Sequence, residues 1–281
     1  MTYGVPVTRL LDVATSYDAV LLDAYGVLVD TSGAIAGAPE AVRALEAAGV
    51  PFLVVSNDGS RLPETVSARL ASFGFRVPPE RIITSGSLLD GWFADHRLAG
   101  ARCFVLGPDD SRRYVERAGG RVVPVAADAE VDVVVAGDED GFDFLPVLDA
   151  TLSALIRAVD TGCPPALVQP NPDLIYPAAP GRFGFTIGVA TLALEAALER
   201  RYPGRGLRFE RLGKPNPPLF AEAVRRIGSR RLLMVGDQLE TDIAGARRFG
   251  LDAALVVTGI TRAEDAMRDH SIAPTWILDR L

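Results

Sequence analysis

Short apolar runs alternate with helix-forming stretches at both ends of this 281-residue chain. Residues 19–22 are followed by Asp23, residues 51–55 are followed by Ser56, and a helical pattern at 39–48 separates the two runs. Short uncharged runs are typical of strands that are buried on both faces. Their alternation with helices predicts an α/β fold with a doubly wound parallel sheet of the Rossmann type.

The alternation is interrupted once, in the middle of the chain. It continues through 63–73 and 81–84 and resumes in helices at 217–227 and 241–249 and strands at 232–235 and 253–257. The intervening stretch predicts strands of its own at 103–106, 131–135 and 166–168, a helix with apolar residues at 3.6-residue spacing between 144 and 159, and a Pro- and Gly-rich loop at 176–184. We therefore expect a core formed by 1–85 and 208–281, with an inserted α/β domain at 86–207.

Composition narrows the functional classes. Hydrophobic residues make up 48% and charged residues 23%, which is typical of a globular protein. A formal charge of −7 argues against binding nucleic acid or anionic membrane. No apolar run reaches the ~18 residues of a membrane span and no secretory leader is evident, so a cytoplasmic location is expected. Cys103 and Cys163 lack metal or disulfide spacing and are predicted to be buried free thiols.

Four polar residues are expected to gather at one edge of the predicted sheet. Asp23, Ser56 and Asp237 each follow a predicted strand, and ligands of open parallel sheets collect beyond the carboxyl ends of the strands. Lys214 is the single lysine among 29 Lys plus Arg residues, and it precedes the helix that leads to the Asp237 strand. Because a compact ammonium cannot be replaced by a guanidinium, a lone lysine in an Arg-rich chain is a candidate functional residue.

Asp237 and Asp242 place two carboxylates around a strand-to-helix turn. Hard oxygen ligands of this kind suit Mg²⁺, which usually takes one or two carboxylates together with substrate phosphate. For Asp242 an alternative remains open, because an acidic residue in the first turn of a helix is also favoured by the helix dipole. The sequence thus predicts a site for a metal ion and an anion.

The arrangement resembles the haloacid dehalogenase (HAD) superfamily. The similarity lies in four motifs that occur in order, namely Asp23-Ala24-Tyr25-Gly26-Val27-Leu28, Ser56-Asn57, Gly213-Lys214-Pro215 and Gly236-Asp237 with Thr241-Asp242. The long insertion after the second motif resembles the cap domain of the NagD-like and pyridoxal-phosphatase-like branch. Further similarities to that branch are Thr84-Ser85-Gly86, Asn171-Pro172-Asp173 and Thr258-Gly259.

The resemblance implies a phosphatase that acts on a small phosphorylated metabolite, with a role for each motif residue. It also implies a homodimer that forms through the cap. Asp23 is expected to form an aspartyl-phosphate, and Mg²⁺ to be held by Asp23, Asp237 and the Tyr25 carbonyl, with Asp242 in support. Ser56 and Asn57 are expected to shape the phosphoryl pocket. Lys214 is expected to neutralise charge beside Asp23, a role that matters because electrostatics and positioning dominate phosphoryl transfer.

Tyr25 departs from the pattern, since the phosphatases of this superfamily carry an acid/base Asp at that position. A phenol with an ordinary pKa near 10 is a poor proton shuttle at neutral pH, and general acid–base help is worth roughly 10²- to 10⁴-fold. Three interpretations follow: a slow or leaving-group-limited phosphatase, which we favour, a haloacid dehalogenase, whose first motif Asp-Ala-Tyr-Gly resembles, or a non-catalytic phosphate-binding regulatory module. Asp58 is a hypothetical substitute acid.

Overall fold

Two units make up the fold in the computed structural model, which describes residues 5–179, 181–256, 273–279 and 281. The first unit combines the chain up to Ser56 with Pro63–Ile83 and the chain from Lys214 onward, and the second comprises Asn57–Leu62 and Thr84–Gly213. The second unit thus takes in residues 57–62 and continues to Gly213, beyond the predicted insertion at 86–207. Thr258-Gly259 lies outside the described residues.

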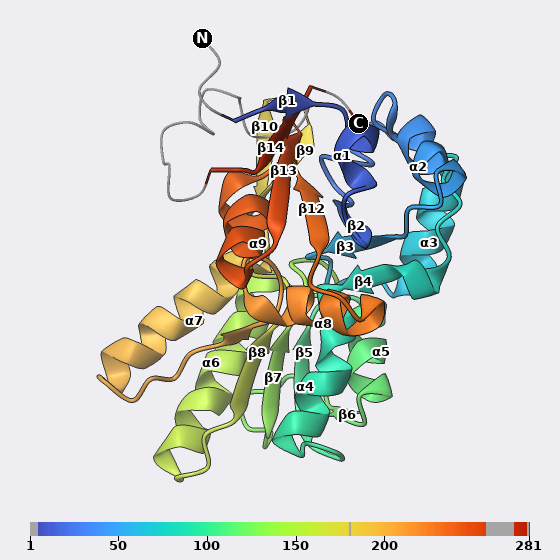
Figure 1. Ribbon diagram of the computed structural model, residues 1–281. Helices are drawn as coiled ribbons and strands as arrows, with labels where there is room; N and C mark the ends of the chain where they lie inside the picture. The colour runs from blue at the N-terminus through green and yellow to red at the C-terminus, as the bar shows by residue number, and fades with distance from the viewer. Residues whose placement is uncertain (1–4, 180, 257–272, 280) are drawn as a thin grey trace. The chain divides into compact units, whose positions relative to one another are not determined.

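The first unit contains a seven-stranded sheet in the order β1-β14-β13-β12-β2-β3-β4 (Figure 1). The strands β1, β14, β13, β12, β2 and β3 run parallel. Their bounds are β1 Val7–Thr8, β2 Ala19–Asp23, β3 Phe52–Ser56, β4 Ile82–Thr84, β12 Leu232–Gly236, β13 Asp252–Val256 and β14 Trp276–Leu278. Every residue of β2 and β12 is buried, as expected for strands at the centre of a parallel sheet.

Helices pack on both faces of this sheet. One face carries α1 (Leu10–Ala14), α2 (Ala38–Ala47) and α3 (Pro63–Ser72), whose apolar residues join the alternate strand residues in one core. Two further helices are α8 (Pro217–Ile227) and α9 (Ala244–Phe249), and α9 packs against β13. Pro39 lies in the first turn of α2 and Gly49 follows that helix with a φ of 68°, as helix boundaries favour. A 3₁₀ turn, η1 (Pro79–Arg81), precedes β4.

The second unit has a five-stranded parallel sheet in the order β11-β8-β7-β5-β6. The strand bounds are β5 Arg102–Leu106, β6 Arg121–Val122, β7 Val133–Ala136, β8 Ala166–Gln169 and β11 Glu210–Arg211. Helices α4 (Leu89–His96) and α5 (Asp109–Arg117) pack on one face, and α6 (Phe144–Asp160) and α7 (Ile187–Arg201) pack on the other. A 3₁₀ turn, η2 (Ser85–Leu88), leads into α4. Both sheets confirm the predicted doubly wound α/β class.

Three local predictions need correction. The stretch 176–184 is an antiparallel hairpin of β9 (Ile175–Ala179) and β10 (Arg182–Phe185), because a two-stranded ribbon consists of edge strands that tolerate Pro. The predicted helix at 241–249 begins instead as a π-helical turn, η3 (Leu239–Ile243), before α9. Cys103 is a buried free thiol, but Cys163 is exposed, since it follows the end of α6. Within the described ranges, every helix falls short of the length and apolarity that a bilayer crossing requires.

Candidate active site

The two central strands of the first unit carry the predicted carboxylates to the same edge of the sheet. Leu22 on β2 pairs with Val235 on β12, so Asp23 comes one residue and Asp237 two residues after this pair, on neighbouring parallel strands. Asp23 also pairs with Val55 on β3, which places Ser56 one residue farther along on the other side. This edge is formed by carboxyl ends of strands, where ligands of open sheets collect.

Lys214 joins two of these carboxylates directly. Its ammonium Nζ donates hydrogen bonds of 2.6 Å to Oδ1 of Asp23 and of 2.6 Å to Oδ1 of Asp242. The lysine side chain is 3% exposed and the Asp242 side chain 0% exposed, so both ion pairs are buried. A buried charge pair of this kind requires close hydrogen bonding, because desolvation of each ion is costly.

Burial and the neighbouring charges together shift the pKa values of Asp23 and Lys214. Burial raises the pKa of the Asp23 carboxyl well above its usual range, Lys214 opposes this rise, and the Asp242 and Asp237 carboxylates add to it. Burial also opposes the charge of Lys214, but Asp23 and Asp242 outweigh it and raise the pKa of the ammonium. Lys214 therefore stays protonated, and its ammonium pairs with two of the three buried carboxylates, Asp23 and Asp242.

Two glycines make room for this packing. Gly26 has a φ of 94°, a left-handed conformation that L side chains rarely adopt, and a Cβ at this position would overlap the carboxylate of Asp237. A Cβ at Gly236 would likewise overlap the carboxylate of Asp242. The glycines of the first and fourth motifs therefore let two acidic side chains lie against the backbone.

The donor set fits a divalent cation. Asp23, Asp237 and Asp242 are all buried, and each offers a carboxylate oxygen within 4.8 Å of those of the other two. With Lys214 charged, the group carries a formal excess of two negative charges, which a divalent ion would neutralise. Hard carboxylate oxygens are the ligands that Mg²⁺ and Ca²⁺ prefer in proteins.

Tyr25 and Ser56 are the other predicted site residues that lie in the first unit. Tyr25 is half-buried and packs against the core shared with α1, α2 and α3, in a turn where the Gly26 amide donates to the Val29 carbonyl at 2.8 Å. Ser56 is half-buried as the last residue of β3. Both positions lie at the same edge of the sheet as Asp23.

Asn57 groups with the second unit although it directly follows Ser56. Its Nδ2 donates a 2.9 Å hydrogen bond to Oδ1 of Asp173, and its carbonyl accepts a 2.7 Å bond from Oγ of Ser85. The second motif is thus divided, with Ser56 in the first unit and Asn57 in the second.

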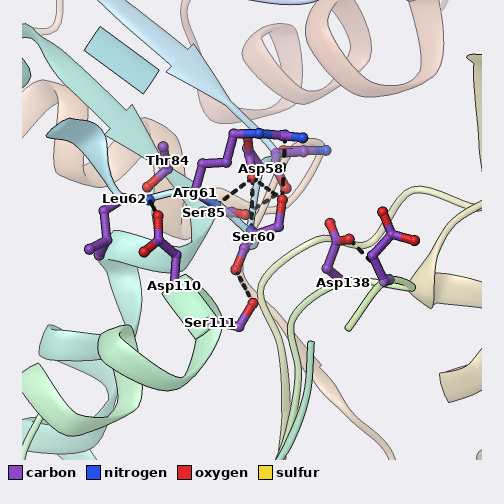
Figure 2. Close-up of polar contacts among 12 residues, drawn as sticks. Asp58, Ser60, Arg61, Leu62, Thr84, Ser85, Asp110, Ser111 and Asp138 are labelled. Carbon is purple, nitrogen blue, oxygen red and sulfur yellow. Dashed lines mark hydrogen bonds and ion pairs between the residues drawn. The ribbon is translucent and has the colours of Figure 1, made fainter. Parts of the chain in front are cut away.

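The segment that follows Asn57 is held by an extensive set of hydrogen bonds. Asp58 Oδ1 accepts from Ser60 Oγ and from the Ser60 and Arg61 amides, and Oδ2 pairs with the Arg61 guanidinium at 3.0 Å, as Figure 2 shows. Asp110 accepts from the Leu62 amide at 3.1 Å. The structure therefore gives the Asp58 carboxylate a role in closing this turn, which weakens its case as a substitute acid.

The sequence places Asp173 in the Asn171-Pro172-Asp173 similarity but predicts no role for it. It is 116 residues from Asn57 along the chain, so no spacing pattern could connect the two side chains. The motifs contain Gly26 and Gly236, but the sequence alone does not indicate that these glycines make room for the carboxylates of Asp237 and Asp242.

Two family models match this chain, one in its first half and one at its carboxyl-terminal end. Residues 20–121 match a model described as haloacid dehalogenase-like hydrolase, and residues 211–281 match a HAD-hydrolase-like model. These two matches contain the strands that carry Asp23 and Asp237, and Lys214 as well.

Individual proteins are similar over nearly the whole chain. Human chronophin (Homo sapiens) is 32% identical, with 97% of this chain and 93% of chronophin covered. A possible sugar phosphatase of the HAD superfamily from Cytophaga hutchinsonii has a crystal structure with a TM-score of 0.85, 31% identity and coverage of 99% and 98%. A glycerol phosphate phosphatase from Mycobacterium tuberculosis, crystallised with magnesium, has a TM-score of 0.78 and 29% identity, with 94% of this chain and 75% of that chain covered.

Proposed function

This chain belongs to the haloacid dehalogenase superfamily, in its NagD-like branch of hydrolases, and we propose that it is a magnesium-dependent phosphatase of a small phosphomonoester. The observation that carries this proposal is the bridge from Lys214 to Asp23 and Asp242, with Asp237 beside it. The sugar and glycerol phosphate phosphatases among the similar proteins support a phosphorylated sugar or polyol as substrate.

Asp23 is the proposed nucleophile. One carboxylate oxygen attacks phosphorus and forms an aspartyl-phosphate, the bond from phosphorus to the ester oxygen breaks, and water then cleaves the acyl phosphate. Lys214 already lies within hydrogen-bond distance of Asp23, so its charge is in place where negative charge develops. Preorganised charge of this kind is usually the largest single contribution to catalysis. Ser56 and Asn57 are the proposed residues of the phosphoryl pocket.

Magnesium would be held by Asp23, Asp237 and the Tyr25 carbonyl, with Asp242 in support through its bond to Lys214. When bound, the ion supplies Lewis acidity and neutralises the buried carboxylates. The glycerol phosphate phosphatase from M. tuberculosis has been crystallised with magnesium and with calcium, which supports a divalent cation at this site, and Mg²⁺ is the ion that we propose.

Tyr25 limits the proposed reaction. Its ring packs against the apolar core of the first unit, where the superfamily phosphatases present a carboxyl group for proton transfer. Without that carboxyl group, neither the leaving oxygen nor the attacking water receives the usual help, so substrates with acidic leaving groups should react best.

The test is phosphate release by purified protein from a panel of esters, with Mg²⁺ and with EDTA. We expect Mg²⁺-dependent turnover that is faster for aryl and acyl phosphates than for alkyl sugar phosphates. Halide release from a 2-haloacid without metal would instead identify a dehalogenase, in keeping with Tyr25. Loss of all turnover, with Mg²⁺ and phosphate still bound, would identify a regulatory module. A homodimer through the second unit remains part of the proposal, to be measured by light scattering.

A further inference from the structure

A cavity of about 760 Å³ lies within the second unit, at the amino ends of strands β5, β7 and β8. Arg102 begins β5, Asp132 directly precedes β7 and Pro165 directly precedes β8, and all three residues line the cavity. The last turns of α6 and the segment 128–131 form most of the remaining lining. Because sites for small molecules commonly span ~300–1,000 Å³, this volume is large enough for a ligand.

The cavity contains one arginine that is already neutralised. Nε and Nη2 of Arg102 donate hydrogen bonds of 2.9 and 2.8 Å to the two carboxylate oxygens of Asp132, and Nη1 donates to Glu130. The bonds from Arg102 lower the pKa of the Asp132 carboxyl. Arg102 therefore has little charge to offer a ligand, and its two acidic partners leave a formal excess of one negative charge.

Arg157, the second arginine of the cavity, is not neutralised. Its half-buried guanidinium donates a 2.6 Å hydrogen bond from Nη2 to the Ala129 carbonyl, and it forms no ion pair with any described residue. A guanidinium carries several further N–H donors in a planar fork that matches a carboxylate. Since a partly buried charge is costly to leave unpaired, Arg157 suits the carboxylate of a ligand.

Negative groups lie close to Arg157 along the chain. Ala129, whose carbonyl accepts from Arg157, stands between Asp128 and Glu130, and both acidic side chains are exposed and line the cavity. Helix α6 also ends here, and the last carbonyls of a helix favour a cation. The cavity thus offers a positive group and several negative groups that are not paired with one another, a pattern that complements a zwitterion.

The rest of the lining is apolar and consists largely of small side chains. Val131, Ala154 and Pro165 are buried and Ala158 is half-buried, and all four line the cavity. Short side chains leave room for an aliphatic group, whose burial is favourable at roughly 25 cal/mol per Å² of apolar surface. The ligand should therefore have an apolar body beside its charged groups.

We propose that this cavity binds a zwitterion with an apolar body, of the chemical class of an aliphatic α-amino acid. The carboxylate of the ligand pairs with Arg157, its ammonium group with Asp128 and Glu130, and its aliphatic side chain packs on Val131 and Ala154. The binding does not depend on the proposed phosphatase function, because no lining residue takes part in that reaction.

Cys163 provides a readout that needs no turnover. Its thiol is exposed and lines the cavity, whereas Cys103 is buried, and burial raises the pKa of the Cys103 thiol to about 11. Because the thiolate is the species that reacts, iodoacetamide should alkylate Cys163 first in the full chain. Mass spectrometry of the peptide that contains Cys163 then measures the rate, and a bound ligand should slow it.

The probes are leucine and two compounds with the same apolar body. Saturating leucine should slow alkylation of Cys163 at least about fivefold, since the ligand occupies the cavity. At the same concentration, 4-methylpentanoate, which lacks the ammonium group, and 3-methylbutylamine, which lacks the carboxylate, should each slow it less than about twofold. Absence of protection by leucine would overturn the site, and equal protection by either analogue would overturn the zwitterion as its ligand.

Variants assign the charged contacts. Arg157→Gln should abolish the protection by leucine and leave the alkylation rate without ligand unchanged, because the glutamine retains a donor for the Ala129 carbonyl. Asp128→Asn should reduce the protection by at least about twofold. Arg200→Gln, the same exchange at an exposed position of α7, is the matched control and should protect as wild type does. Undiminished protection in Arg157→Gln would overturn the proposal.

Discussion

The ammonium of Lys214 lies 2.6 Å from a carboxylate oxygen of Asp23, although 191 residues separate them along the chain. The same ammonium bonds Asp242 at 2.6 Å, so the third motif is connected to both the first and the fourth. All three side chains are buried, so these two ion pairs depend on the shape of the cationic side chain at position 214.

Lys214→Arg should lower kcat/KM by at least about 100-fold, even though the charge is retained. A planar guanidinium is larger than an ammonium and cannot place one donor on each of two carboxylates in the same buried volume. Steady-state hydrolysis of p-nitrophenyl phosphate with Mg²⁺ measures the loss. Arg43→Lys, which exchanges the same two residue types at an exposed ion pair with Glu40, is the control and should be neutral. Activity of Lys214→Arg within about twofold of wild type would place Lys214 outside the site.

Tyr25→Asp should raise the turnover of an alkyl sugar phosphate by at least about tenfold, because it restores a carboxyl group for proton transfer. We expect less than the full 10²- to 10⁴-fold range of general acid–base catalysis, since the surroundings accommodate a ring. The gain should be smaller for p-nitrophenyl phosphate, whose leaving group needs little protonation. The comparison is made with purified Tyr25→Asp and wild type in Mg²⁺.

Tyr25→Phe serves as the matched control for that exchange, because it keeps the ring packing and removes only the hydroxyl. Its rate should remain close to that of wild type on both substrates if the phenol transfers no proton. Efficient hydrolysis of the sugar phosphate by wild type, with no gain from Tyr25→Asp, would mean that another group supplies the proton.

The partly buried carboxyl group of Glu139 is expected to make the stability of the second unit depend on pH. Burial, and then the neighbouring Asp138 carboxylate, raise the pKa of the Glu139 carboxyl to about 7, and its Oε2 is buried without a hydrogen bond among the described residues. The folded state therefore keeps this proton at pH values where the unfolded state has released it. The resulting stabilisation is complete below the ordinary pKa of 4.5 and is lost as the pH rises through about 7.

Glu139→Gln should remove that dependence. Its melting temperature, measured by calorimetry from pH 4.5 to 8, should fall less steeply with rising pH than that of wild type, so that the variant is the more stable form at pH 8. Glu116→Gln, at an exposed position of α5, is the control and should follow wild type. Parallel curves for Glu139→Gln and wild type would show that Glu139 does not ionise late.

The fold, and the cluster of Asp23, Lys214 and Asp237 in the first unit, could be predicted because both depend on local sequence patterns. Buried strands of a parallel sheet are short apolar runs, and the residues that end them must meet at one edge, which brings Asp23 and Asp237 together. Lys214 could be predicted as a site residue because it is the single lysine in an Arg-rich chain.

Other features depend on tertiary contacts that leave no periodic trace. The bond from Asn57 to Asp173 joins residues 116 apart, and the hairpin of β9 and β10 resembles a loop in composition because its edge strands tolerate Pro177. The exposure of Cys163 follows from its position after α6, which hydrophobicity alone does not indicate.

The most direct test of the central claim is acid-quenched turnover with a ³²P-labelled aryl phosphate, in Mg²⁺ and in EDTA. Because Tyr25 offers no base for water attack, we predict that a phosphoprotein accumulates in Mg²⁺, with a burst of the aryl leaving group and the label on the peptide that contains Asp23. Neither label nor burst should occur in EDTA or in Asp23→Asn, whose nearly isosteric amide preserves the strand end. Mg²⁺-dependent phosphate release by Asp23→Asn at the wild-type rate, with no labelled peptide in either protein, would contradict the account.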